Sequence, residues 1–336
     1  MEELKETVTT YVGKGMSIKQ ATGIAGISKS SYYYKPSGGP RGRRPSENTL
    51  CKGEPVSNEK VVDDIKNIIS AEFIDYGYDK VTHVLRGMGY TINGKKAYRL
   101  MKEHNLLMPL KRKRKIAGKK YVEFTTPRFT RPLHIIEADI KHIYIHGQRK
   151  NAFLLTFLDT CTRMALEWTL GFTMRKQTVE HAINQLFNNW LRPNQVPTKQ
   201  LQVFLRTDNG SQFIAHLVRD TLAQNKIQQE FIKPATPQQN AHIESFHSTV
   251  EKLVCQRVEM DSLEYAGDIF KRFYQVYNNQ RILRPLLYNP PARFFEMFQQ
   301  GLIEIKWDEK KKENKFSFSR EAGKSPAPLP EVLLLG

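Results

Sequence analysis

The segment Arg206-Thr207-Asp208-Asn209-Gly210-Ser211 decides how the fold of this chain is interpreted. The apolar residues before it predict a strand, which puts Asp208 just beyond the strand end, and Asn209-Gly210 permits a tight turn there. Glu244 follows, with 35 residues between the two acids, in a segment that predicts a helix. A third acid, Asp139, lies upstream in the predicted strand Ile135-Ile136-Glu137-Ala138-Asp139-Ile140. Two aspartates on strands and a glutamate on a helix are the ligands that a two-metal phosphoryl-transfer site needs.

The chemistry of these acids predicts bound cations. Two unit charges about 4 Å apart repel by roughly 4 kcal/mol at an effective dielectric constant near 20, and divalent cations remove that penalty. Ligands that are all oxygen favour Mg²⁺, with Mn²⁺ able to replace it. We therefore predict that Asp139, Asp208 and Glu244 are both the catalytic residues and the metal ligands, with Asp139 bridging two ions. Each acid alone has a structural explanation, as a turn former or as a favourable charge near a helix N-terminus.

The order of predicted elements around the acids indicates the fold class. Residues 134–146, 152–159 and 164–171 predict three successive strands, and residues 201–206 and 227–232 predict two more. Helices are predicted over residues 179–191, 212–224 and 239–258. Three strands followed by alternating helix and strand predict an α/β fold, in which helices flank a mixed five-stranded sheet. This order matches the ribonuclease-H-like fold.

Composition indicates the partner. The chain has 336 residues, a formal net charge of +18 and a pI of about 9.7, which favours nucleic acid over an anionic membrane surface. Residues 1–133 contain 26 Lys and Arg against 13 Asp and Glu, so the front of the chain is expected to hold DNA. Three scattered cysteines predict neither disulfides nor structural zinc. With no apolar run of membrane-spanning length and no signal peptide, the protein is expected to be soluble and cytoplasmic.

The front half divides into two predicted helix-turn-helix modules. Residues 1–36 form the first, and its second helix would offer Lys29, Ser30, Tyr32 and Tyr33 to DNA, although a structural three-helix cap is an equal alternative. Residues 37–57 read as a linker, with Arg41, Arg43 and Arg44 available for phosphates. Residues 58–108 form the second module, with apolar faces that predict helices over residues 59–71, 80–88 and 95–104. The outer face of the last helix carries Lys95, Lys96, Arg99 and Lys102, and is expected either to contact DNA or to be merely solvated.

Three further segments complete the predicted organisation. Residues 109–130 form a basic linker, expected either to lie along the phosphate backbone or to be solvated; its cations are Lys111, Arg112, Lys113, Arg114, Lys115, Lys119 and Lys120. Residues 131–298 form the catalytic core, in which Lys233 and Gln238 flank the glutamate segment and could touch DNA near the cut. Residues 299–336 are interpreted as a short extension and a tail.

Several motifs carry a family resemblance. The two acid segments are Thr207-Asp208-Asn209-Gly210-Ser211-Gln212-Phe213 and Pro237-Gln238-Gln239-Asn240-Ala241-His242-Ile243-Glu244-Ser245-Phe246-His247. Together with Tyr277-Asn278-Asn279-Gln280-Arg281, they make residues 130–298 resemble the catalytic core of retroviral integrases and, more closely, of bacterial insertion-sequence transposases of the IS-three type. The paired modules in front are similar to those of the same transposases. In a departure from the pattern, Glu137 replaces the aromatic residue often found two before the first aspartate.

The departure at Glu137 bears on the metal site. Residues i and i+2 of a strand share a face, so Glu137 could crowd the ions or compete with Asp139 as a ligand. The motif alignment favours Asp139. His247 lies near Glu244 along the helix and is expected either to support it or to be a partly buried structural histidine.

The resemblance implies a transposase that binds the ends of its element and transfers a 3′-hydroxyl to a new phosphodiester. Implied partners are double-stranded DNA, as terminal inverted repeats and as target, and further copies of the chain on that DNA, in the bacterial nucleoid. The lack of leucine-zipper heptads leaves open a need for a second protein from the same element. The alternatives are a DNA-binding regulator with an inactive nuclease core and a non-specific nuclease of the same fold.

Overall fold

The chain divides into two units, which are described separately. The computed structural model describes residues 1–35, 46–109, 128–232 and 240–319. Met1–Ser46 form the first unit and Glu47–Gly336 the second. None of the helices in these described ranges combines the length and the apolar character needed to cross a membrane.

The first unit is a bundle of three short helices, α1 (Glu2–Gly13), α2 (Ile18–Ile24) and α3 (Lys29–Tyr33). Serine side chains cap the second and third helices, because the Ser17 and Ser28 hydroxyls accept hydrogen bonds from backbone N–H groups in the first turns. Between these helices the chain turns at Gly26, whose φ of 66° suits glycine. The helix-turn-helix pattern expected for these residues is therefore present.

The second unit begins with another helical module, made of α4 (Asn58–Ser70), α5 (Tyr78–Gly87) and α6 (Gly94–Glu103). The apolar faces predicted from the sequence meet in one core, which includes Val62, Ile65, Val84, Leu85, Leu100 and Met101. Asn93 caps α6 through a hydrogen bond from the backbone N–H of Lys96 to its side-chain oxygen at 2.8 Å. The three helices expected in this module are all present, within two residues of their predicted ends.

The second module also contains strands that the sequence interpretation missed. β1 (Asn48–Cys51) and β2 (Glu54–Ser57) form an antiparallel hairpin, and β1 also pairs with β3 (Tyr90–Thr91). The module is therefore not all-α, and residues 48–57 are not a linker. The hairpin turn is Lys52-Gly53, with both φ angles positive, at 49° and 92°. The charged and glycine residues of this turn resemble a linker in composition, which is why the prediction was wrong.

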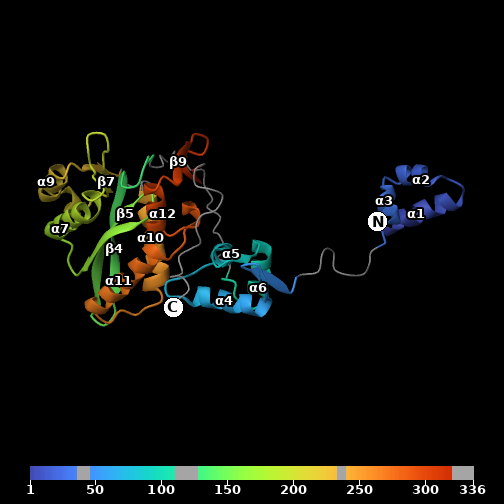
Figure 1. Ribbon diagram of the computed structural model, residues 1–336, viewed down its shortest axis with the longest axis horizontal. Coiled ribbons are helices and arrows are strands. Elements are labelled where there is room, and N and C mark those ends of the chain that lie inside the picture. Colours follow the sequence, from blue (N-terminus) through green and yellow to red (C-terminus); the bar gives the residue numbers. More distant parts are fainter. Residues whose placement is uncertain (36–45, 110–127, 233–239, 320–336) are drawn as a thin grey trace. The chain divides into compact units, whose positions relative to one another are not determined.

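The core of the second unit is a five-stranded mixed sheet (Figure 1). Its strands are β4 (Ile135–Ile145), β5 (Lys150–Asp159), β6 (Ala165–Gly171), β7 (Phe204–Thr207) and β8 (Gln228–Phe231). The strand order is β6-β5-β4-β7-β8, antiparallel through β4–β6 and parallel from β4 to β8. The predicted ribonuclease-H-like sheet is confirmed.

Helices cover both faces of this sheet (Figure 1). α7 (Lys176–Leu186) and α9 (His216–Gln224) pack on one face, where Ile136, Ala138, Leu155 and Phe157 point. α10 (Ala241–Val250) and α11 (Leu263–Asn279) pack on the other, against Ile143, Leu154 and Leu158. Each of α7 and α10 continues as one π-helical turn, Phe187–Leu191 and Glu251–Cys255. The helix predicted over residues 212–224 is broken into α8 (Ser211–Ile214) and α9 by the extended backbone of Ala215.

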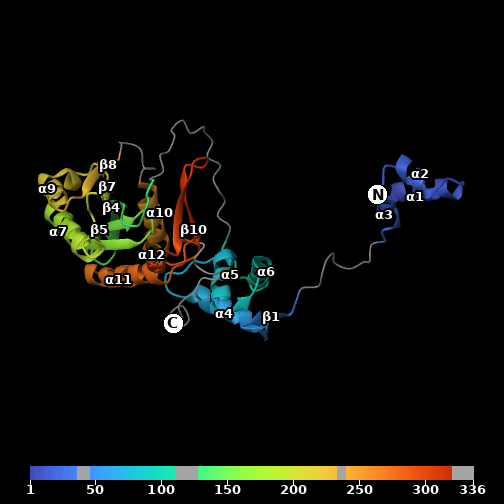
Figure 2. The ribbon, with the colours of Figure 1, turned by 45° about the horizontal axis from the view of Figure 1, so that its top comes forward.

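The end of the described chain contains more structure than expected. After a 3-10 turn (Arg284–Leu286) and α12 (Pro291–Gln299), β9 (Ile303–Asp308) and β10 (Glu313–Phe318) form an antiparallel hairpin beside α12 (Figure 2). Its Phe316 ring packs on Phe294 at 4.8 Å between centroids. Residues 303–318, the first part of the predicted extension, therefore form a hairpin that packs on the core, and residues 320–336 lie outside the described ranges.

Buried polar contacts join the second helical module to the core. Arg281, which is 6% exposed and follows α11, donates to the Asp75 carboxylate and to the Phe73 carbonyl of the module. The Tyr76 hydroxyl accepts the backbone N–H of Ile282 at 2.7 Å, and the Ile282 side chain belongs to the core of the module. The segment that closes the catalytic core therefore also anchors the helical module.

Candidate active site

The pairing of β4 with β7 brings the two aspartates together. These strands are parallel, with Ile135 opposite Phe204 and Glu137 opposite Arg206. Continuing this register by two residues brings Asp139 level with Asp208, just past the end of β7. The two side chains line one cavity of about 260 Å³, together with Gln212 and Met174. Strand register thus gathers two acids that are far apart in the sequence.

Asp208 is held by the turn that follows it. Its Oδ1 accepts the backbone N–H of Gly210 at 2.9 Å. A Cβ atom at Gly210 would lie only 2.9 Å from that same oxygen and 2.6 Å from the Gln212 amide nitrogen. A residue other than glycine would therefore push against the carboxylate that it helps to place. The tight turn predicted at this position has this physical basis.

Asp139 is stabilised in its ionised form by its neighbours. Burial is the largest single influence and would raise its pKa, but the hydrogen bond and charge of His247, the Ile140 backbone N–H and the charge of Lys141 together lower the pKa. The His247 Nδ1 atom lies 3.3 Å from Asp139 Oδ2, and the Ile140 backbone N–H donates to Oδ1 at 2.8 Å. His247 is largely buried and contacts Asp139, and its charge also acts to lower the pKa of Glu244. The buried Nε2 atom of His247 has no hydrogen-bond partner among the described residues.

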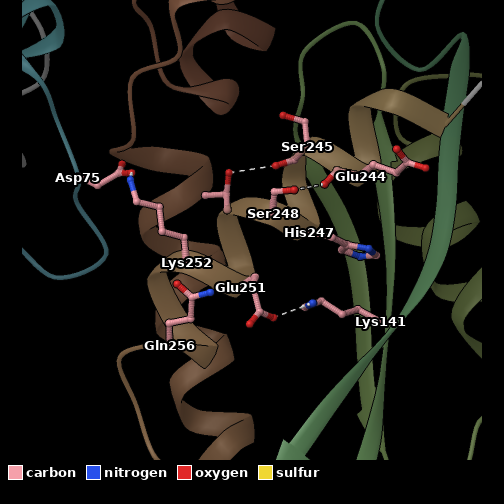
Figure 3. A pocket seen from close by; sticks show the side chains of 10 residues that line it. Asp75, Lys141, Glu244, Ser245, His247, Ser248, Glu251, Lys252 and Gln256 are labelled. Atoms are coloured by element: carbon pink, nitrogen blue, oxygen red, sulfur yellow. Dashed lines mark hydrogen bonds and ion pairs between the residues drawn. The ribbon is translucent and has the colours of Figure 1, made fainter. Parts of the chain in front are cut away.

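Glu244 lies in the first turn of α10, on the side of that helix from which His247 reaches the sheet (Figure 3). Its pKa is raised, by partial burial and then by the negative charge of Asp139, while His247 acts in the opposite direction. Asp139 therefore shares a cavity with Asp208 and is contacted by His247, which follows Glu244 by three residues on α10.

Glu137 contacts α10 instead of extending toward the cavity. Its side chain is fully buried, and Oε2 accepts the backbone N–H of Ile243 at 2.8 Å. Burial raises the pKa of Glu137 to about 7, although Arg163 and Arg206 nearby act to lower it. Its oxygen satisfies an N–H group that the first turn of a helix leaves without an intrahelical acceptor. The Glu137 carboxylate is thus engaged by α10, and it is not among the residues that line the cavity of the two aspartates.

Asp139 connects the three acids, but the carboxylates of Asp139, Asp208 and Glu244 do not surround a single point. Among the residues that the structure describes, no three His, Cys, Asp or Glu side chains stand close enough to hold one ion. Residues 233–239, which precede α10, lie outside the described ranges. The predicted contacts Lys233 and Gln238 fall in that segment.

The residues predicted to bind DNA divide into three groups. Lys29, Ser30 and Tyr33 in the first module, and Lys95 and Lys102 on α6, are exposed. The Tyr32 hydroxyl is hydrogen-bonded to Thr9, the Lys96 ammonium donates to the Asn48 carbonyl at 2.7 Å, and Arg99 lies 3.9 Å from Glu103. Outside the described residues lie Arg41, Arg43, Arg44, Lys111, Arg112, Lys113, Arg114, Lys115, Lys119 and Lys120. Of the predicted cations in the described residues, Lys29, Lys95 and Lys102 are therefore exposed, and their contact with DNA stays a prediction.

Three residues at the site were not singled out from the sequence. Lys141 follows Asp139 by two residues on β4, and Gln212 lines the cavity of the aspartates. Thr156 lies opposite Asp139 on β5 and is hydrogen-bonded to the Tyr274 hydroxyl of α11. Strand periodicity could have identified Lys141, because residues i and i+2 share a face. No local signal pairs Thr156 with Tyr274.

Family comparisons agree with this architecture. Residues 130–237 and 225–291 match integrase core domain models, and residues 57–114 match an HTH-like domain model. The chain is 24% identical to the transposase for insertion sequence element IS904 of Lactococcus lactis subsp. lactis (strain IL1403), over 75% of this chain and 97% of that protein. It is also 24% identical to an insertion element IS407 protein of 31.7 kDa from Burkholderia multivorans (strain ATCC 17616 / 249), over 65% of this chain and 75% of that one.

Solved structures with a related chain include a simian T-cell lymphotropic virus intasome in complex with PP2A regulatory subunit B56 gamma, at 14% identity and a TM-score of 0.43, covering 71% of this chain and 74% of that one. Another is the Mos1 transposase catalytic domain with raltegravir and Mg, at 16% identity and a TM-score of 0.38, covering 50% and 78%. An HTH-like match followed by integrase core matches, together with the insertion-sequence relatives, identifies the family. The chain belongs to the insertion-sequence DDE transposases, polynucleotidyl transferases built on an integrase core domain.

Proposed function

We propose that the protein binds the ends of its own insertion element, cleaves a DNA strand there and joins the freed 3′-hydroxyl to a new phosphodiester. The observation that carries this proposal is the position of Asp139, which lines one cavity with Asp208 and is contacted by His247, three residues after Glu244 on α10. Phosphoryl transfer depends chiefly on positioning and on stabilising negative charge, and cations held by the three carboxylates would supply that stabilisation.

The donor set fits Mg²⁺ or Mn²⁺. All three side chains offer carboxylate oxygens, and two of them already line the same cavity. Asp139 would hold both of two ions, and Asp208 and Glu244 one each. Bound ions of this kind polarise the phosphodiester and offset the charge on the leaving oxygen. A complete shell requires Glu244 to approach the two aspartates, since the described residues do not hold the three acids at one point.

The chain's own residues prepare this arrangement. His247 donates to Asp139 and so keeps its carboxylate ionised and oriented. Glu137 fixes the start of α10 against β4, one residue before Glu244. The Asp139 and Glu244 carboxylates are thereby held on neighbouring elements, β4 and α10. Attack on a phosphodiester requires reacting groups that are positioned in this way.

The proposed partners are double-stranded DNA, as element ends and as target, and further copies of this chain on that DNA. The exposed Lys95 and Lys102 of α6 and the formal net charge of +18 support DNA as the partner. A second protein from the same element is a further candidate partner, and the bacterial nucleoid is the proposed location.

The test uses the full chain and duplex oligonucleotides that carry the terminal DNA of the element. With Mg²⁺ we expect strand cleavage and joining, and Asp208→Asn or Glu244→Gln should lower the rate by at least about 10²–10³-fold while DNA binding persists. Cleavage that survives both substitutions would refute the assignment. Equal cleavage of random DNA would favour the nuclease, and specific binding without cleavage in Mg²⁺ or Mn²⁺ would favour the regulator.

A further inference from the structure

A groove of about 570 Å³ follows α10 and the π-helical turn after it (Figure 3). Glu244 lines it, as do hydroxyl groups on the outer side of the helix, among them Ser245 and Ser248. Two lysines line it as well, Lys141 from β4 and Lys252 from the π-helical turn. The groove therefore joins a catalytic carboxylate to a polar surface that contains ammonium groups.

Of these two lysines, Lys141 lies nearer to the reaction centre. It follows Asp139 by two residues on β4, so both side chains leave the same face of the strand. Its positive charge is one of the causes of the lowered pKa of Asp139, after the hydrogen bonds that Asp139 accepts. Lys252, in contrast, is engaged by the Asp75 carboxylate, which is only 10% exposed.

The partner of Lys141 is an exchangeable one. The Lys141 Nζ atom lies 2.9 Å from Glu251 Oε2, and the two side chains are 19% and 45% exposed, respectively. An ion pair with so exposed a carboxylate contributes little to stability, because water and salt screen it. The Glu251 carboxylate also has side-chain hydrogen bonds with Gln256 and Cys255, so it keeps partners of its own when another anion takes its place on Lys141. A phosphate group could then take the place of the carboxylate on the same ammonium.

We propose that Lys141 binds a backbone phosphate of the DNA strand that enters the active site, and that Glu251 is its counter-ion until DNA arrives. The proposal rests on the proposed function, since it takes the strand near Glu244 to be the one that reacts. The ligand class is a nucleic-acid phosphodiester.

A phosphate-by-phosphate scan tests this proposal. Duplexes of the element end are prepared with one neutral methylphosphonate at a time near the cleaved bond, and their affinities are measured without Mg²⁺. For the wild type we expect one position at which neutralisation weakens binding about 10- to 100-fold. Lys141→Gln should weaken binding to the unmodified duplex by a similar factor and show no further loss at that position. Equal losses for both proteins at every position would overturn the proposal.

Two further variants separate phosphate binding from a structural ion pair. The swap Lys141→Glu with Glu251→Lys keeps an ion pair between β4 and the π-helical turn, so thermal unfolding should stay near the wild type while the phosphate effect remains lost. If the swap restores that effect at the same phosphate, the ion pair has only a structural role and the proposal fails.

The matched control is Lys150→Gln. It removes an exposed lysine at the start of β5 and should leave the scan like that of the wild type.

The experiment distinguishes failure of the phosphate site from failure of the proposed function. The scan measures binding alone, so a wild type that shows the phosphate effect but never cleaves would refute the transposase reaction and leave the phosphate site standing. A wild type that cleaves element ends without any position sensitive to Lys141→Gln would refute only the phosphate site.

Discussion

The Glu137 carboxylate accepts a hydrogen bond from the backbone N–H of Ile243 at 2.8 Å, in the fully buried contact between β4 and α10. Asp139 follows Glu137 by two residues on the strand, and Glu244 follows Ile243 by one on the helix. This single bond therefore spans the two elements that carry two of the three proposed catalytic acids. Asn240, at the N-terminal end of α10, makes no side-chain capping bond, so Glu137 takes that role from a distant strand.

We expect Glu137→Ala to loosen this contact and Glu137→Gln largely to preserve it. Alanine leaves a buried N–H group without its acceptor, which should lower the free energy of unfolding by about 1–3 kcal/mol and reduce strand cleavage at least about tenfold. Glutamine keeps a side-chain oxygen and should retain most of both. Denaturant unfolding and Mg²⁺-dependent cleavage of element ends measure the two effects. Wild-type cleavage by a folded Glu137→Ala protein would show that the contact does not place Glu244.

Asp75→Ala should destabilise the second unit strongly. The substitution leaves the Arg281 guanidinium buried beside the module without its carboxylate, and breaking a buried pair in this way costs about 3–5 kcal/mol. Asp63→Ala is the matched control, because its pair with Lys66 is exposed at both ends and should change stability by less than about 1 kcal/mol. Urea unfolding of the three proteins compares the free energies. Similar values for the two variants would contradict a role of Asp75 in anchoring the module.

Lys80 should make stability depend on pH in the alkaline range. Burial, and then the charge of Arg281, lower its pKa to about 8. In the unfolded chain the pKa of Lys80 is 10.5. Between pH 8 and 10.5 the unfolded state therefore binds more protons than the folded state, and the free energy of unfolding rises with pH over this range. At pH 7, Lys80→Met should be more stable than the wild type by up to about 3 kcal/mol. That advantage should shrink as pH rises. A difference that stays constant from pH 7 to 10.5 would rule out this titration.

Lys95→Ala and Lys102→Ala should each weaken the salt dependence of DNA binding. A lost phosphate contact lowers the slope of log affinity against log salt by about 0.9, whatever the DNA sequence. Lys96→Ala should instead reduce stability, since its ammonium donates to the Asn48 carbonyl across the module. Affinities between 50 and 200 mM salt give the slopes, with Lys66→Ala on α4 as the control. An unchanged slope for both Lys95→Ala and Lys102→Ala would remove α6 from the DNA interface.

The local elements were predictable because their signals are local. Ser17, Ser28 and Asn93 cap helices within the two modules that the sequence predicted, and the predicted strand at residues 134–146 is β4. The hairpin at Asn48–Ser57 was missed because a short turn rich in Lys and Gly has the composition of a linker. The hairpin at Ile303–Phe318 was missed because its Phe316 packs on Phe294 and Phe129, which are distant in the sequence, and no local pattern predicts that contact.

The sequence by itself determined which acids are present, their order, and the type of element that carries each one. Only the tertiary structure decided that Asp139 and Asp208 line one cavity, that His247 contacts Asp139, and that Glu137 holds α10. The reason is physical: helix caps and side-chain periodicity depend on residues a few positions apart. Strand register and buried hydrogen bonds join residues about a hundred positions apart, so they exist only once the sheet and helices have packed together.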